Sequence, residues 1–120
     1  MKILVADDSR VMRQIVIRTL RQADFGDHEI IEAPDGAAAF ETVGAEKPDL
    51  VLSDWNMPGM TGIELLRALR AGGNEVPFGF ITSESSEEMA KMATDAGALF
   101  LIVKPFTADI FREQLGSLLG

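Results

Sequence analysis

The stretch Leu50-Val-Leu-Ser-Asp-Trp-Asn-Met-Pro-Gly59 lies near the centre of the chain and decides the fold that we predict. Its first four residues are apolar or small. The run stops abruptly at Asp54, where a turn-rich segment with Pro58 and Gly59 begins. A short apolar run bounded by turn residues is typical of a strand buried on both faces. Asp54 therefore stands where this strand leaves the sheet, a position that exposes its carboxylate.

Three other stretches have the same form and a further one is more mixed in polarity, so strands and helices are predicted to alternate along the whole chain. The predicted strands cover residues 3–6, 30–33, 50–53, 78–82 and 99–103. The second of these is mixed in polarity, which indicates an edge strand. Gly79 lies inside the fourth strand and indicates a close approach by a neighbouring backbone or side chain.

Capping residues mark where the predicted helices begin. These signals are Ser9, the capping boxes Thr61–Glu64 and Ser85–Glu88, and Thr107. The second helix is predicted to cover residues 37–43 and to end at Gly44. The apolar positions of each helix recur at spacings of three and four, as expected for helices that pack one face on a sheet.

Five strand–helix units with apolar strands imply a parallel sheet covered by helices on both faces, a doubly wound α/β architecture with right-handed crossovers. A chain of 120 residues suits one domain, which we expect to cover residues 1–120. The content of 47% apolar and 25% charged residues is ordinary for a globular protein.

Charge and composition exclude several classes of function. A net charge of −8 argues against a nucleic-acid partner, and we interpret the four arginines of the first helix (10, 13, 18 and 21) as a solvated helix face. The chain has no cysteine, which excludes disulfides, thiolate catalysis and zinc–thiolate sites. It also has no apolar stretch long enough for a signal-peptide core or a membrane span, so we expect a cytoplasmic protein.

Polar residues suited to phosphate chemistry end four of the five predicted strands. In open parallel sheets the active site lies beyond the carboxyl ends of the strands, where the strand order reverses. The residues at these ends are Asp7 and Asp8 after the first strand, Asp54 after the third, Thr82 at the end of the fourth and Lys104 after the fifth.

Three carboxylates in one place repel one another and need compensating positive charge. An all-oxygen site with room for water suits Mg²⁺, and Lys104 would add a second positive charge. A carboxylate can itself accept a phosphoryl group and form an acyl phosphate. Catalysis would then consist mainly of positioning and charge neutralisation, as expected for phosphoryl transfer.

These motifs, taken together and at this spacing, resemble the receiver domains of two-component response regulators, in particular the single-domain chemotaxis (CheY-like) type. The resemblance rests on Asp7-Asp8, Asp54-Trp-Asn-Met-Pro-Gly-Met-Thr-Gly62, Thr82 and Lys104-Pro105, and it covers essentially the whole chain. It implies a flavodoxin-like fold with a five-stranded sheet in the order 2-1-3-4-5.

The resemblance also implies a role for each residue of the site. Asp54 would be the phosphoacceptor, with Lys104 and Thr82 holding the phosphoryl oxygens. Mg²⁺ would be bound by Asp8 and Asp54 directly, by Asp7 through a water and by the backbone carbonyl of Asn56. The Lys104–Pro105 bond would be cis. Asn56 and Glu84 lie at positions that influence how quickly relatives lose the phosphoryl group.

One position departs from the family pattern. Many relatives carry Tyr or Phe at the position of Leu101, and that aromatic changes rotamer on activation. We therefore expect the partner surface to comprise the fourth helix, the last strand and the fifth helix, without an aromatic gate.

The predicted function is a phosphorylation-dependent signalling switch. A histidine kinase or phosphotransfer protein would donate to Asp54, and a monomeric chain would act on a separate output protein, with chemotaxis as one candidate pathway. The chain would catalyse only its own phosphorylation and dephosphorylation. Two alternatives of the same fold are a phosphate sink and a phosphorylation-independent interaction module.

A flavodoxin-like binding protein or hydrolase is a second class of function, and the residues disfavour it. A flavin binder needs a phosphate loop after the first strand, where Asp7-Asp8-Ser9 would repel phosphate without a metal. A haloacid-type phosphatase needs a second Asp where Asn56 stands. His28, the only histidine, is interpreted as a loop or strand-start residue, and Trp55 as a packing residue.

Overall fold

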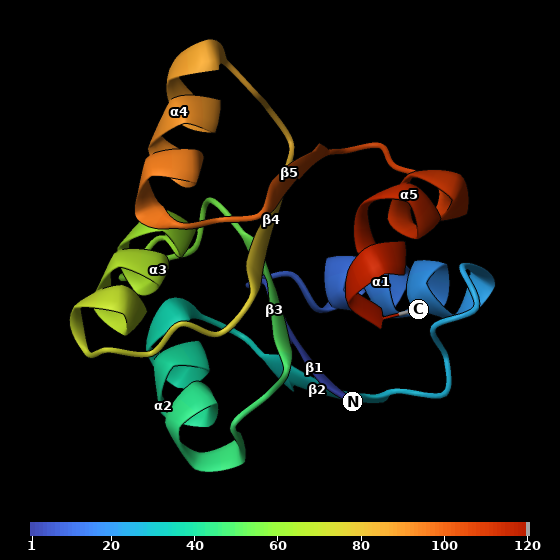
Figure 1. The fold of residues 1–120 in the computed structure, drawn as a ribbon, viewed down its shortest axis with the longest axis horizontal. Coiled ribbons are helices and arrows are strands. Elements are labelled where there is room, and N and C mark those ends of the chain that lie inside the picture. Colours follow the sequence, from blue (N-terminus) through green and yellow to red (C-terminus); the bar gives the residue numbers. More distant parts are fainter. Residues whose placement is uncertain (120) are drawn as a thin grey trace.

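Strands and helices alternate five times along residues 1–119, the part of the chain that this computed structural model describes (Figure 1). The strands are β1 (Lys2–Ala6), β2 (Glu29–Ala33), β3 (Leu50–Asp54), β4 (Phe78–Thr82) and β5 (Phe100–Val103). The helices are α1 (Arg10–Gln22), α2 (Gly36–Glu46), α3 (Gly62–Ala71), α4 (Glu87–Ala96) and α5 (Ala108–Leu119). None of these helices is long and apolar enough to cross a membrane.

The strands form one parallel sheet in the order β2-β1-β3-β4-β5, which confirms the predicted architecture and the edge position of β2. Helices α1 and α5 cover one face of the sheet, and α2, α3 and α4 cover the other (Figure 1). The central strands are apolar without interruption because side chains alternate between two buried faces. Leu4 and Val51 pack towards α2 and α3, whereas Val5 and Leu52 pack towards α1 and α5.

Three of the four predicted N-terminal caps are present. The Ser9 hydroxyl accepts a bond from the Met12 N–H (3.2 Å), and the Thr107 hydroxyl accepts one from the Ile110 N–H (3.3 Å). Thr61 and Glu64 form the full capping box. The N–H and hydroxyl of Thr61 donate to the Glu64 carboxylate, and these bonds lower its pKa.

The cap predicted at Ser85 is wrong, because helix α4 begins one residue later. Ser86 has the extended backbone of an N-cap, and its hydroxyl accepts a bond from the Met89 N–H (3.1 Å). Glu87 and Glu88 then fall in the first turn, where negative charge favours the helix dipole. Two adjacent serines can each serve as a cap, and the packing of the helix selects one of them.

The predicted end of α2 at Gly44 is also wrong. The helix continues to Glu46 and ends at Lys47, which adopts a left-handed conformation (φ 49°) and closes the last turn onto the Val43 carbonyl. Pro48 follows and cannot continue a helix. Gly44 is exposed, and a Cβ added there would meet no neighbouring atom within 4 Å. The helix runs through Gly44, so the low helix propensity of glycine alone does not end it.

Smaller differences concern element boundaries and single side chains. β2 begins one residue earlier than predicted, β3 ends one residue later at Asp54, and β5 begins one residue later at Phe100. In α5, Ile110 is exposed, whereas Phe111, Leu115 and Leu119 are buried. The close approach predicted at Gly79 is confirmed, because a Cβ at this residue would collide with the ring of Phe100.

We predict that Gly62→Ala lowers the free energy of unfolding by about 1–3 kcal/mol. A Cβ at Gly62 would collide with the backbone carbonyl oxygen of Asp54 and lie 3.0 Å from the ring of Phe80. The matched control is Gly44→Ala, which should raise stability by about 0.5–1 kcal/mol because the site is open. Urea denaturation measures both, and equal effects of the two variants would contradict this account.

Candidate functional site

The predicted site residues meet at the carboxyl end of the sheet. Asp7 follows β1, Asp54 ends β3, Thr82 ends β4 and Lys104 follows β5. β1 and β3 are neighbours whose helices lie on opposite faces of the sheet, so the site opens where the strand order reverses. The fold therefore brings together residues as far apart in the sequence as Asp7 and Lys104.

Three carboxylates form a compact acidic cluster there. Asp7, Asp8 and Asp54 each place a carboxylate oxygen within 4.8 Å of the others. The Nζ of Lys104 lies 3.5 Å from Oδ2 of Asp7 and 3.7 Å from Oδ1 of Asp54. The Asp7 and Asp54 side chains are only 6% and 11% exposed, so water screens their repulsion poorly.

The Asp54 carboxyl shows the electrostatic consequence. Burial, and secondarily the negative charge of Asp7, raises the pKa of Asp54 above its ordinary value. Lys104 and the backbone N–H groups of Trp55 and Asn56 oppose this shift, the Trp55 N–H donating to Oδ1 at 2.8 Å. The pKa of Asp54 nevertheless remains raised. The positive groups nearby therefore offset only part of the burial and repulsion that disfavour the ionised carboxylate.

Asp7 and Asp8 are held very differently. The Asp7 N–H donates to the Ala33 carbonyl (3.1 Å), and its Oδ1 accepts from the Ser9 N–H (2.8 Å). Asp8 is exposed, and its carboxylate takes part in none of the hydrogen bonds or ion pairs found within residues 1–119. Its carboxylate is therefore free to bind a ligand, and its position depends on the backbone around it.

The donor set fits a small divalent cation. All the donors are oxygens, two of the carboxylates are nearly buried, and Asp8 faces solvent. Mg²⁺ takes oxygen ligands at 2.0–2.1 Å, and carboxylate oxygens that lie within 4.8 Å of one another are near enough to close around one such ion after a small adjustment of the side chains. The backbone carbonyl of Asn56 accepts no hydrogen bond within the described residues and is available as a further oxygen.

Thr82, the Lys104–Pro105 peptide and Trp55 lie around the site as the sequence suggested. Thr82 is buried, and its Oγ1 accepts only a long bond from the Glu84 N–H (3.5 Å). The Lys104–Pro105 peptide is cis, as expected. Trp55 packs against Phe80 with ring centroids 4.7 Å apart. Met57 is buried in the core.

Arg13 is a residue of this region that the sequence interpretation missed. The four arginines of α1 were interpreted as a solvated face, yet the Arg13 side chain is only 13% exposed. Its Nη1 donates to the backbone carbonyl of Asp7 at 2.6 Å, and its Nε donates to Oε1 of Glu32 at 3.0 Å. The only signal in the sequence was that Arg13 lies one turn after the Ser9 cap. The structure shows that this position faces the end of β1.

The raised pKa of Asp54 predicts a pH-dependent contribution to stability. The folded state binds the Asp54 proton more tightly than the unfolded chain does. This contribution is therefore fully present below the ordinary pKa of 3.8 and is lost as pH rises through the raised folded value. In EDTA, Asp54→Asn should melt at a higher temperature than the wild type near neutral pH.

The difference in melting temperature should shrink as pH falls through the folded pKa, where both side chains are neutral. Asp27→Asn, at an exposed position, is the control and should show no such trend. If Asp54→Asn melted below the wild type at neutral pH, burial and repulsion would not be the dominant effects at this carboxyl.

Comparison with known proteins identifies the class to which this fold and site belong. The family model for the response regulator receiver domain matches residues 3–115. The chemotaxis protein CheY of Pseudomonas aeruginosa is 41% identical over 117 residues, which are 96% of this chain and 93% of that protein. Chemotaxis protein CheY-3 of Vibrio cholerae is 44% identical over 96% of this chain and 88% of its own length.

Solved structures agree with these relatives. Chemotaxis protein CheY4 of Vibrio cholerae superposes with a TM-score of 0.86 at 34% identity, and the match covers 98% of both chains. The chain belongs to the response regulator receiver domain family and is CheY-like. Its function is that of a phosphorylation-dependent signalling switch of a two-component system.

Proposed function

We propose that Asp54 is the phosphoacceptor of this switch and that a histidine kinase or phosphotransfer protein is the donor. The observation that carries the proposal is the ion pair between Lys104 and Asp54, set beside two further carboxylates at the reversal of strand order. The names of the relatives favour a chemotaxis pathway. We also propose that the protein is cytoplasmic and monomeric, as expected from the sequence.

In the proposed reaction a carboxylate oxygen of Asp54 attacks the phosphorus of phosphohistidine. An O–P bond forms as the P–N bond breaks, and the product is an acyl phosphate on Asp54 with free histidine on the donor. The N–H groups of Trp55 and Asn56 orient the carboxylate. The Lys104 ammonium stabilises the charge on the transferred group, and positioning supplies most of the catalysis.

The proposal includes a cation site and an activation contact. Asp7, Asp8, Asp54 and the Asn56 carbonyl would hold Mg²⁺, which when bound supplies positive charge against the repulsion between phosphoryl oxygens and carboxylates. The Thr82 hydroxyl uses its oxygen for the long Glu84 contact and keeps its proton to donate to a phosphoryl oxygen.

We further propose that the chain acts as an enzyme only on itself, in accepting and losing its own phosphoryl group. Asn56 and Glu84 are both exposed beside the site. They are therefore placed to affect the approach of water to the acyl phosphate and so its lifetime.

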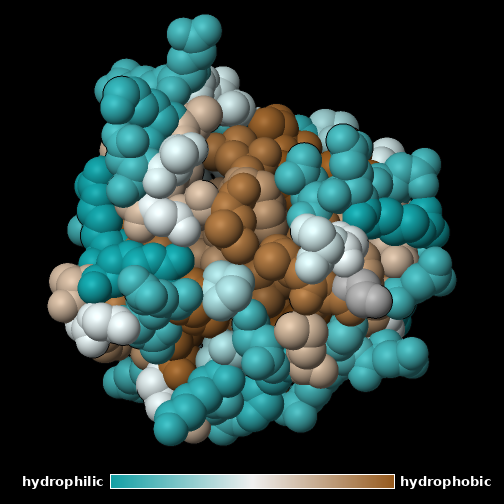
Figure 2. Space-filling model, in the orientation of Figure 1, coloured by the Kyte–Doolittle hydropathy of each residue, from teal (hydrophilic) through white to brown (hydrophobic). Residues whose placement is uncertain are grey.

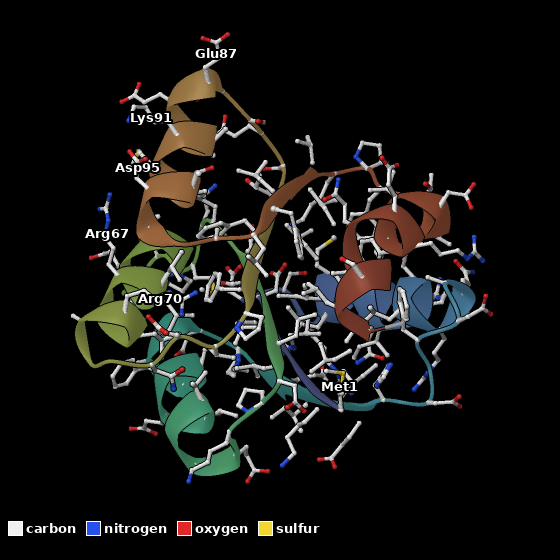
Figure 3. All side chains as sticks on the ribbon, viewed as in Figure 1. Met1, Arg67, Arg70, Glu87, Lys91 and Asp95 are labelled. Atoms are coloured by element: carbon white, nitrogen blue, oxygen red, sulfur yellow. The ribbon has the colours of Figure 1, made fainter. Side chains whose placement is uncertain are left out.

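The output surface in this proposal is formed by α4, β5 and α5. Figure 2 shows apolar surface over β5 between the two helices, where Leu99 and Val103 are 56% and 40% exposed. Charged side chains of α4, among them Glu87, Lys91 and Asp95, point away from the sheet into solvent (Figure 3). An apolar surface with a charged margin is typical of a site for a protein partner.

A structural path links the site to this surface. Thr82 pairs with Val103 across the two strands, and the Lys104 N–H donates to the Thr82 carbonyl at 2.8 Å. A displacement of Thr82 towards a phosphoryl group would therefore move β5. Leu101, in place of an aromatic, is partly buried against the α3–α4 side of the core, so the movement of the strand would carry the signal.

Incubation with acetyl phosphate tests the acceptor. Intact-mass measurement should show one phosphoryl adduct that requires Mg²⁺ and is absent in Asp54→Asn. Asp95→Asn, at an exposed position on α4, is the matched control and should be modified like the wild type. An adduct that persists in Asp54→Asn, or none in the wild type, would overturn the proposed acceptor.

Hydrogen exchange separates a switch from a phosphate sink. With beryllofluoride and Mg²⁺ bound, amide protection should change at Thr82, in the loop before α4 and along β5. Thr82→Ala should bind the same ligands and lose most of the change in β5. A wild type whose β5 protection stays constant on binding would instead be a sink or a constitutive interaction module.

A further inference from the structure

Arg13 connects three elements beside the acidic cluster. It lies in the first turn of α1, its Nη1 donates to the carbonyl of Asp7 at the end of β1, and its Nε pairs with Glu32 on β2. Gln14 donates to the same Oε1 of Glu32 at 3.4 Å. With two parts of its planar group held by different residues, the Arg13 guanidinium has little freedom to rotate.

The carbonyl that Arg13 holds belongs to the peptide bond between Asp7 and Asp8. On the other side of Asp7, the N–H is bound to Ala33, so the two ends of the residue are tied to β2 and α1. Asp8 has no side-chain partner within the described residues, so this peptide is what sets the direction of its carboxylate. The orientation of this peptide therefore affects where one candidate cation ligand, the Asp8 carboxylate, lies.

We propose that Arg13, anchored by Glu32, is a positioning residue for the cation site: it fixes the Asp7–Asp8 peptide so that the Asp8 carboxylate points at Asp54. This inference rests on the proposed function, since it concerns the same site. Arg13 touches neither the phosphoryl group nor the cation and acts through the backbone. Groups of this kind, which orient ligands from behind, commonly change metal affinity 10- to 100-fold when removed.

Electrostatics and positioning predict opposite changes in Mg²⁺ affinity when Arg13 is removed. As a positive charge near the cluster, Arg13 repels a cation, so its removal would tighten Mg²⁺ binding if charge alone mattered. The Glu32 charge, left without its partner, would tighten binding further. If Arg13 acts by positioning Asp8, its removal weakens binding in spite of both charge effects.

Isothermal titration of Mg²⁺ into the full chain makes this distinction. Arg13→Met should raise the Mg²⁺ Kd about tenfold. The control is Arg10→Met, which removes the same charge from the same turn of the helix. Arg10 is exposed, and its side chain makes no hydrogen bond within residues 1–119. The Mg²⁺ Kd of this control should stay the same or fall. Glu32→Gln should raise the Kd more in the wild type than in the Arg13→Met background, where only the loss of its charge remains, because Glu32 positions the ligand through Arg13.

Phosphorylation by acetyl phosphate adds a kinetic readout. The Mg²⁺ concentration for half-maximal rate should rise in Arg13→Met, while the rate at saturating Mg²⁺ stays near that of the wild type. Thermal melting in EDTA checks that the variant is folded. If Arg13→Met does not fold, Arg13→Lys, which keeps the charge and lacks the planar fork, should still raise the Kd.

A Kd in folded Arg13→Met that is equal to or tighter than that of the wild type would overturn the positioning role, as would an unchanged Kd in Arg13→Lys. Failure of the proposed function looks different, because the wild type itself would then neither bind Mg²⁺ nor form the adduct on Asp54.

Discussion

Three carboxylates share one end of the sheet, and their mutual repulsion governs how the surrounding residues are arranged. Asp7 and Asp54 are nearly buried, where water screens charge poorly, and the raised pKa of Asp54 shows that the folded chain compensates only part of the cost. Lys104 lies between two of them and cannot neutralise all three. The protein thus holds an excess of negative charge that a bound divalent cation would neutralise, and this neutralisation would allow a carboxylate of the site to approach a negatively charged phosphoryl group.

The fold supports this imbalance through rigid backbone contacts. Parallel pairing of β1 with β3 sets Asp7 beside Asp54, and close packing of Gly62 against the Asp54 carbonyl holds the end of β3. The ring of Trp55 packs on Phe80 beneath the site. Because repelling groups move apart unless their backbone is held, the apolar strands and tight turns are part of the functional design and not merely its scaffold.

A second layer of polar residues surrounds the charged one. Arg13 and Glu32 neutralise each other and lie behind the Asp7–Asp8 peptide, and Ser9 caps a helix while its N–H holds Asp7. On the opposite side, Thr82 and Lys104 join the site to the edge strand β5 and its apolar surface. The same few backbone hydrogen bonds therefore orient the site residues and connect them to the proposed partner surface.

Local pattern was enough to predict the strands, the parallel architecture and the residues at the strand ends, because buried strands need unbroken apolar runs and their ends must be polar. The resemblance to receiver domains added the strand order and the expected roles. Local pattern failed where two neighbours were equally suited, as with Ser85 and Ser86, and where an exposed glycine was tolerated inside a helix, as with Gly44. It could not find Arg13, since the bond from Arg13 to the Asp7 carbonyl and its pair with Glu32 depend on how α1 lies against β1 and β2. The sequence alone specifies which polar residues follow the strands. Their distances, their burial and the interaction of their charges are set only by the tertiary structure, because long-range packing brings the strand ends together.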